Sequence, residues 1–194
     1  MKRLSWKIGS AAFAAVLLVV CCVAAWRPYQ DKKQPAEAAM QIPKPGPEME
    51  RLKFLIGSWD WNAEYEKTPM TPQGGKTNGW YKAQLGPGGF SIIADFSENG
   101  PLGEEIGHEV LAWDPKQNTY TSVIVGNFPG AVIGKSHWDG ENLVTETEFT
   151  ANGVTMHLRS MYTDIKDKST RMEESSQVGD GPIQVIWKGV ATRK

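Results

Sequence analysis

Hydrophobic and polar residues alternate along most of the chain that follows Gly57. In the first such stretch, Trp59, Trp61 and Tyr65 fall on one face, while acidic and amide side chains fall on the other. A period of two residues is typical of a β-strand with one buried face and one solvated face. Nine further strands are predicted in the same way, at residues 77–85, 90–96, 105–113, 119–127, 132–138, 143–150, 154–163, 170–178 and 183–192.

The connections between these strands are short and rich in turn-forming residues. Segments 114–118, 139–142 and 151–153 read DPKQN, DGEN and ANG, and they supply the Asp, Asn and Gly that hairpins favour. No helical period interrupts the series, so parallel crossover units are not expected. Ten antiparallel strands joined by hairpins either stack as a sandwich or close on themselves, and closure removes exposed edges. The predicted fold class is an all-β, up-and-down barrel of about ten strands.

A short helix is predicted directly before the first strand. Pro47 suits the first helical position, and the acidic residues Glu48 and Glu50 favour the positive end of a helix. Apolar residues then recur at helical spacing until Gly57 ends the pattern. We expect this helix to close one end of the barrel.

The chain before this helix divides into two parts. Residues 1–25 begin with basic side chains and continue with an uncharged apolar run, which is the plan of a signal peptide. An uncleaved membrane anchor is the alternative, as is a lipoprotein, although the two valines before Cys21 depart from a lipobox. Residues 26–47 contain five prolines and no apolar period, which predicts a flexible tether. The β-barrel domain is then expected to cover 48–194.

Charge and cysteine content exclude several classes of function. Both cysteines of the chain lie within 1–25, so a mature form would have no disulfide and no reactive thiolate. Loss of Lys2, Arg3 and Lys7 would leave 18 basic against 22 acidic side chains. Such a mildly acidic protein has no electrostatic reason to bind nucleic acid. We expect an exported protein, periplasmic or extracellular, that contacts the membrane only if its N-terminal segment stays uncleaved.

The phrase FLIGSW at residues 54–59 resembles the start of calycin barrels, the group of lipocalins, fatty-acid-binding proteins and nitrobindin-like barrels. The shared feature is a short helix followed by Gly-x-Trp on the first strand. The resemblance implies that Trp59 lies at the barrel floor and that Gly57 forms the corner. In lipocalins an arginine stacks on that tryptophan, which implies such a role for Arg193 or Arg171 here.

A second resemblance covers residues 44–194. The run KPGPEMERLKFLIGSW, followed later by AWDPKQNTY, is similar to a bacterial family of exported proteins classed as a domain of unknown function. Because that family has no assigned activity, the resemblance implies a fold but no specific reaction or ligand.

Histidines test the alternative of a haem-binding or other enzymatic barrel. Nitrobindin-like haem barrels begin with a similar phrase, but residues 60–69 here are bulkier than the glycine-alternating strand of that family. His137 shares a strand face with Lys135, and His157 shares one with Thr155 and Arg159, so both are expected outside. His108 is in step with Ile106 and Val110 and is the one histidine expected to face inward, as a weak haem candidate. We predict no metal site, no cofactor and no catalytic residue.

Aromatic residues are the best candidates for a binding site. A ten-stranded barrel is wider than the eight-stranded kind that side chains just fill, so an internal pocket is expected. We predict that it holds a small apolar or amphipathic molecule; a structural or interaction domain with a filled core is a further alternative. In fatty-acid-binding barrels an interior arginine and tyrosine hold a carboxylate, and the resemblance implies a similar role for Arg159 or Arg171 with Tyr162. The predicted ligand-binding residues are Trp59, Trp61, Tyr65, Phe90, Phe96, Trp113, Tyr162 and Trp187.

Overall fold

The computed structural model describes residues 44–151 and 153–194. The predicted signal peptide, and the predicted tether up to residue 43, lie outside the described residues. The first element is a helix, α2 (Pro47–Arg51), which continues into a 3-10 helix, η1 (Leu52–Leu55). No helix in the described part of the chain is long and apolar enough to cross a membrane.

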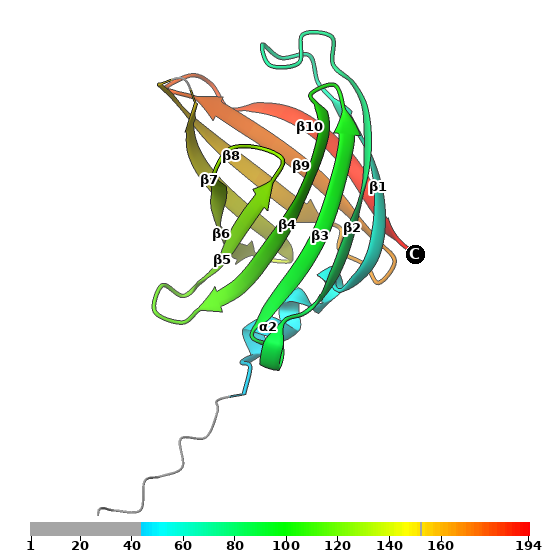
Figure 1. Ribbon diagram of the computed structural model, residues 1–194, viewed down its shortest axis with the longest axis vertical. Helices are drawn as coiled ribbons and strands as arrows, with labels where there is room; N and C mark the ends of the chain where they lie inside the picture. Colours follow the sequence, from blue (N-terminus) through cyan, green and yellow to red (C-terminus); the bar gives the residue numbers. More distant parts are fainter. Residues whose placement is uncertain (1–43, 152) are drawn as a thin grey trace, which may run out of the picture. The chain divides into compact units, whose positions relative to one another are not determined.

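Ten β-strands follow and close into one antiparallel barrel (Figure 1). Each strand pairs with its neighbours in sequence, and β1 also pairs with β10, so that Trp59 lies opposite Arg193. The predicted fold class is therefore confirmed. A short 3-10 helix, η2 (Pro87–Gly89), separates β2 from β3. The strands are β1 (Gly57–Tyr65), β2 (Gly75–Leu85), β3 (Ser91–Gly100), β4 (Gly103–Asp114), β5 (Thr119–Gly126), β6 (Ala131–Asp139), β7 (Asn142–Ala151), β8 (Val154–Thr163), β9 (Ser169–Val178) and β10 (Gln184–Arg193).

The hairpins form where the sequence placed turn residues. Asn118 and Gly140 have positive φ values of 52° and 60°, which Asn and Gly adopt at low cost. In the first of these turns, the Asp114 carboxylate accepts a hydrogen bond of 2.9 Å from the Lys116 backbone N–H. This side-chain bond caps the bend in the way expected of DPKQN.

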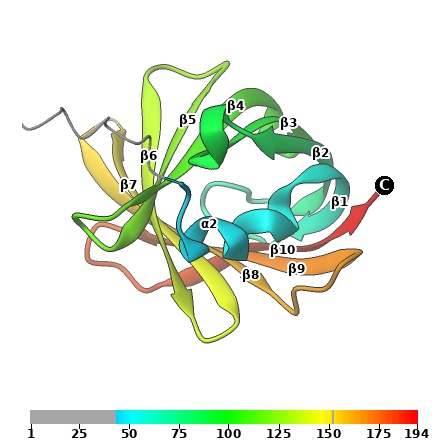
Figure 2. The same cartoon turned by 90° about the horizontal axis from the view of Figure 1, so that it is seen from below.

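Helix α2 covers one end of the barrel, here called the helix end (Figure 2). Beneath it lies a dense core in which Leu52 and Ile92 have no exposed surface and Leu143 has 1%. The Tyr120 hydroxyl donates to the Glu48 carbonyl at 2.8 Å and ties the helix to β5. The expectation that the helix closes the barrel is confirmed. The opposite end, where the β1–β2 and β3–β4 hairpins lie, is called the loop end.

Trp59 forms the floor at the helix end. Its side chain is buried, and its indole N–H donates to the Leu55 carbonyl at 3.2 Å. The Arg193 guanidinium lies 4.6 Å from the Trp59 ring centroid and donates to the carbonyls of Ile56 (2.6 Å) and Phe54 (2.9 Å). The floor position implied by the calycin resemblance is therefore confirmed, and Arg193 is the arginine that stacks.

Candidate ligand-binding cavity

The barrel is hollow above its floor. Phe96, Ile124 and Trp187 face inward by their strand register, yet each keeps part of its surface exposed. All three side chains also line a cavity, so the exposed part of their surface faces internal space. In the core beneath α2, in contrast, Ile92, Leu111 and Leu143 are buried, and Trp113 and Trp138 pack against this core with part of their surface exposed.

This space includes a cavity of about 190 Å³ between the floor and the middle of the barrel. Phe54 and Trp59 bound it at the helix end, and Ile124 and Met172 contribute apolar wall. Aromatic residues make up half of the remaining lining residues, a composition typical of small-molecule sites. The other lining residues are Leu55, Trp61, Tyr81, Phe96, Glu105, Glu109, Tyr162, Thr170, Trp187 and Ala191.

Two aromatic rings owe their positions to glycines on the neighbouring strand. Trp61 stacks on Trp187 with ring centroids 5.8 Å apart and planes inclined by 15°. A Cβ atom added to Gly79, the β2 partner of Trp61, would collide with the Trp61 ring. In the same way, a Cβ on Gly107 would lie 2.6 Å from the Phe96 ring. These glycines let the rings lie flat across β2 and β4.

The structure gathers most of the predicted site residues around this cavity. Trp59, Trp61, Phe96, Tyr162 and Trp187 all line it. The remaining three lie elsewhere and are Tyr65, Trp113 and Phe90.

Each of these three has a different environment. Tyr65 faces inward closer to the loop end, where its hydroxyl donates to Glu98 at 2.9 Å. Trp113 packs in the core of the helix end, with its ring 4.9 Å from that of Tyr120. Phe90 is 38% exposed and ends η2, because strand β3 begins one residue later than predicted. Phe90 therefore does not line this cavity.

The prediction that His108 faces inward is wrong. Its imidazole lies on the outer face, with 70% of the side chain exposed, and its Nδ1 atom is 2.6 Å from an Asp95 carboxylate oxygen. His137 and His157 are also exposed, as expected. All three histidines of the sequence therefore point away from the cavity. The described residues contain no group of three or more His, Cys, Asp and Glu that is arranged to hold a metal ion.

Four glutamates occupy the inward positions that sequence reasoning left out. Glu98 and Glu105 are direct cross-strand partners on β3 and β4, and Glu109 follows Glu105 on the inner face of β4. Glu174 faces inward from β9, opposite Ser160 and Trp187. Strand alternation could have predicted this, because Glu109 is two residues from the buried Leu111 and therefore lies on the same face of β4.

Neutral hydroxyl groups surround these carboxylates. Glu109 accepts a 2.6 Å hydrogen bond from Ser122 and a 3.0 Å bond from Tyr81. Glu174 accepts a 2.8 Å bond from Ser160. Tyr65 and Thr77 both donate to the same oxygen of Glu98, each at 2.9 Å.

Burial raises the pKa of all four carboxyl groups. The pKa of Glu174 rises from 4.5 to about 7, because desolvation and the nearby Glu98 and Glu105 outweigh the hydrogen bond from Ser160. The pKa values of Glu98, Glu105 and Glu109 are raised mainly by the same desolvation. Burial and the Glu109 carboxylate also raise the pKa of the Tyr81 hydroxyl, which therefore remains a hydrogen-bond donor at neutral pH.

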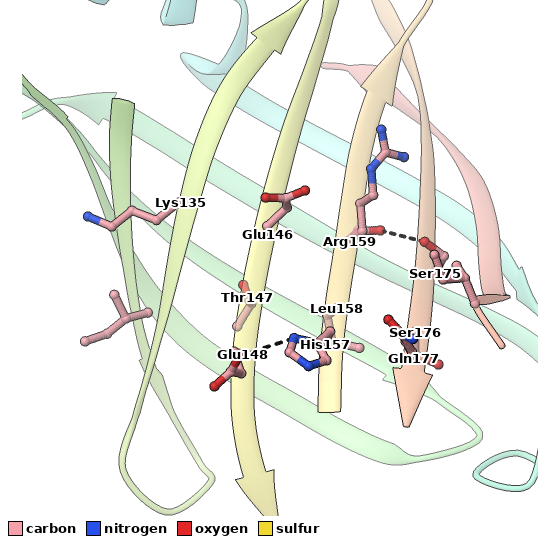
Figure 3. Close-up of a pocket in the computed structure, with 12 residues that line it drawn as sticks. Lys135, Glu146, Thr147, Glu148, His157, Leu158, Arg159, Ser175, Ser176 and Gln177 are labelled. Carbon is pink, nitrogen blue, oxygen red and sulfur yellow. Dashed lines mark hydrogen bonds and ion pairs between the residues drawn. The ribbon is translucent and has the colours of Figure 1, made fainter. Parts of the chain in front are cut away.

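A larger hollow of about 520 Å³ lies over strands β6–β9 (Figure 3). Figure 3 shows its labelled side chains spread over neighbouring strands, with His157 next to Glu148, 3.3 Å apart. Lys135, Glu146 and Arg159 here alternate with the inward residues, so they belong to the outer face. Arg159 is therefore on the opposite face from Tyr162, and the carboxylate site considered for this pair is not formed. An open hollow lined by charged side chains of both signs makes a weaker site for an apolar ring than the internal cavity does.

Arg171 does not form the carboxylate site with Tyr162 either. It is exposed, and its Nε atom lies 3.7 Å from an Asp164 carboxylate oxygen.

Comparison with known proteins shows that this chain is similar in fold to several solved structures. No protein-family model and no curated protein sequence matches the chain. The crystal structure of Rv2717c from M. tuberculosis is similar with a TM-score of 0.53 and 15% identity, over 78% of this chain and 99% of that chain.

Two further structures are more distant. The S-type phycobiliprotein lyase CPES from Guillardia theta has a TM-score of 0.46 and 12% identity, over 76% of this chain and 90% of its own. EF1p2_mFAP2b bound to DFHBI has a TM-score of 0.42 and 13% identity, over 75% and 98%. At such identities the likeness concerns the fold alone. The domain is a calycin-like β-barrel.

Proposed function

We propose that this protein is an exported barrel that binds a small amphipathic molecule in its internal cavity. The observation that carries the proposal is the contrast between the buried core beneath α2 and the inward aromatic residues above it, which border about 190 Å³ of space. Unfilled space lined by large apolar side chains forgoes the packing energy that the rest of the core obtains. A bound molecule would supply those missing contacts.

The size of the cavity limits what it can hold. A cavity of about 150 Å³ in an otherwise packed protein accommodates benzene. The cavity of about 190 Å³ therefore suits one ring with a short substituent. Apolar burial against Trp61 and Trp187 would drive binding, and the polar groups of Glu105 and Glu109 would orient the ligand.

Export and family membership belong to the same proposal and rest on the sequence. The basic start and apolar run of residues 1–25 support secretion, and cleavage after Ala25 is the form we propose. We also place the domain in the family of exported bacterial proteins that its KPGPEMERLKFLIGSW run resembles. N-terminal sequencing of protein purified from a cell-envelope fraction would test export, because an intact Met1 would contradict cleavage.

Both alternatives lose support from this geometry. An interaction domain with a filled core requires a packed interior, whereas Phe96, Ile124 and Trp187 border space. A haem-binding barrel was considered on the strength of His108, whose side chain faces solvent.

Native mass spectrometry tests the proposed binding. Gently purified protein should carry a non-covalent adduct that disappears in the denatured spectrum. Replacement of Ile124 by Trp would fill the cavity and should abolish the adduct. Val123→Trp places the same side chain at the adjacent, outward position and should keep it. An adduct that survives Ile124→Trp, or a bare mass in all samples including those incubated with cell extract, would contradict the proposal.

A further inference from the structure

We propose that the ligand of this cavity is cationic, a compact organic amine that places a single ring against the aromatic walls and its ammonium group among the inward glutamates. This inference rests on the proposed function and adds the charge class of the ligand. Two independent features carry it. The aromatic cavity defines where a molecule lies, and the charges around it define what kind of molecule fits.

The first feature of charge is the position of the carboxylates. Glu105 and Glu109 line the cavity itself. Glu98 lies directly across from Glu105, and Glu174 projects from β9 close enough for Glu98 and Glu105 to raise its pKa. Like charges directly opposite each other on neighbouring strands are destabilising. Four acidic groups thus face one interior in an arrangement that folding alone does not favour.

The second feature is the placement of the basic residues. None of the ion pairs formed within the described part of the chain involves Glu98, Glu105, Glu109 or Glu174. Arg193, the basic residue at the barrel floor, is engaged with Trp59 and three backbone carbonyls. The hydrogen-bond donors that reach the inward carboxylates are all neutral: they are hydroxyls and, for Glu174, also the Trp187 indole. Glu98, Glu109 and Glu174 are partly buried, whereas Glu105 is exposed toward the open interior. A carboxylate that is partly withdrawn from water is stabilised by a cation or by its own protonation.

An organic ammonium ion satisfies both features at once. Its N–H groups supply charged donors to carboxylate oxygens, which form stronger hydrogen bonds than neutral donors do. The faces of Trp61 and Trp187 also attract a cation, because the π-electron face of an indole ring is electronegative. A carboxylate or phosphate ligand, in contrast, would meet like charge in the interior. The cavity size restricts the remainder of the molecule to about one ring.

Protonation of the site should be coupled to binding. Glu174 is faced by Ser160, Trp187, Tyr65, Glu98 and Glu105. A second group, Glu109, is faced by Tyr81, Ser122 and Tyr162. No basic group is among these neighbours. A bound cation stabilises the ionised carboxylates, so its binding releases protons near neutral pH and weakens as the pH falls.

Three probes of nearly equal size separate charge from shape. The full chain, freed of bound molecules by unfolding and refolding, is titrated calorimetrically with 2-phenylethylamine, 2-phenylethanol and phenylacetate at pH 8. We expect the amine to bind at least tenfold more tightly than the alcohol, and phenylacetate not to bind measurably. At pH 5.5 the preference for the amine should fall at least fivefold. Titration at pH 7 in two buffers of different ionisation enthalpy should show proton release.

Two substitutions connect this preference to the cavity. Glu109→Gln keeps the hydrogen-bonding shape of the side chain, and it should weaken amine binding about tenfold while leaving alcohol binding unchanged. Glu146→Gln is the matched control, because Glu146 is exposed on the outer face of β7. It should alter neither affinity. The melting temperature of each variant shows that it is folded.

Several results would overturn the cationic ligand. If 2-phenylethanol binds as tightly as 2-phenylethylamine or more tightly, the ligand is not selected for its charge, although the cavity is still a binding site. Loss of amine binding in 1 mM CaCl₂ at constant ionic strength would identify the glutamates as metal ligands instead. Failure of all three probes would also reject the inference, and the native-mass adduct with its Ile124→Trp control would still decide the proposed function separately.

Discussion

The helix end and the hollow upper part of the barrel are built from the same ten strands but differ in packing and in charge. At the helix end, Ile92 and Leu143 are buried beneath α2, and Arg193 stacks on Trp59. Further along the same strands, Phe96 and Glu109 face an open interior. Close packing at one end supplies the stability that permits unpaired charge and empty space at the other.

Removal of the floor should give the largest effect. Trp59→Ala deletes a buried ring, its hydrogen bond to Leu55 and the stacking of Arg193. We expect a loss of ~3–5 kcal/mol in the free energy of unfolding, measured by urea denaturation. Trp187→Ala, at the cavity, serves as the comparison and should cost clearly less. A similar loss in both variants would mean that the two regions contribute equally to stability.

A matched pair of isoleucines compares the two regions with identical chemistry. Ile92 has no exposed surface at the helix end, whereas Ile124 borders the cavity. Ile92→Ala should lower the free energy of unfolding by ~2–5 kcal/mol, because it creates a new cavity in a packed core. Ile124→Ala should lower it by an amount at or below the low end of that range, because its side chain already borders a cavity. The difference in denaturation midpoint at equal m-value measures this. Equal costs would indicate that the upper barrel is packed in solution.

The charge of the hollow region should reduce stability as the pH rises. With the pKa of Glu174 at about 7 in the folded protein, the folded state retains a proton that the unfolded state releases above its ordinary pKa of 4.5. The free energy of unfolding should therefore fall between pH 4.5 and 7, by ~3 kcal/mol from this group.

Glu174→Gln removes this titration. The variant should match the wild type at pH 4 and exceed it in stability at pH 8. Glu173→Gln is the control on the outer face, where Glu173 pairs with Lys188 at 3.0 Å. If Glu174→Gln is no more stable than wild type at pH 8, the carboxylate is solvated rather than buried.

The smallest effect is expected on the outer wall. His108 and Asp95 form an exposed pair, and such pairs contribute ~0–1 kcal/mol. His108→Ala should change neither stability beyond this range nor the native-mass adduct. A lost adduct would mean that His108 contributes to ligand binding.

Much of the fold followed from local pattern. The period of two, the turn residues at Asn118 and Gly140, and the Gly57 corner with its φ of 119° are properties of short segments, and each appears as predicted. Trp59 at the floor was also within reach, because Gly-x-Trp after a short helix is a local signature. These features depend on residues close in sequence.

The interior of β4 shows why the site was harder to predict. Ile106, His108 and Val110 make the even-numbered face of β4 the more apolar one around His108, so sequence reasoning directed His108 inward. The structure turns that face outward, because Leu111 and Trp113 pack into the helix end and the period of two then carries Glu109 and Glu105 inside.

The sequence by itself therefore determined the strands, the turns, the short helix and the aromatic content of this protein. Only the tertiary structure decided which face of each strand points inward, that the upper barrel stays open, and that four glutamates share its interior. The physical reason is that register in a closed barrel is set by the best-packed part of each strand. The period of two then assigns the other residues of that strand to the inner or the outer face of the barrel, even where the residue is charged.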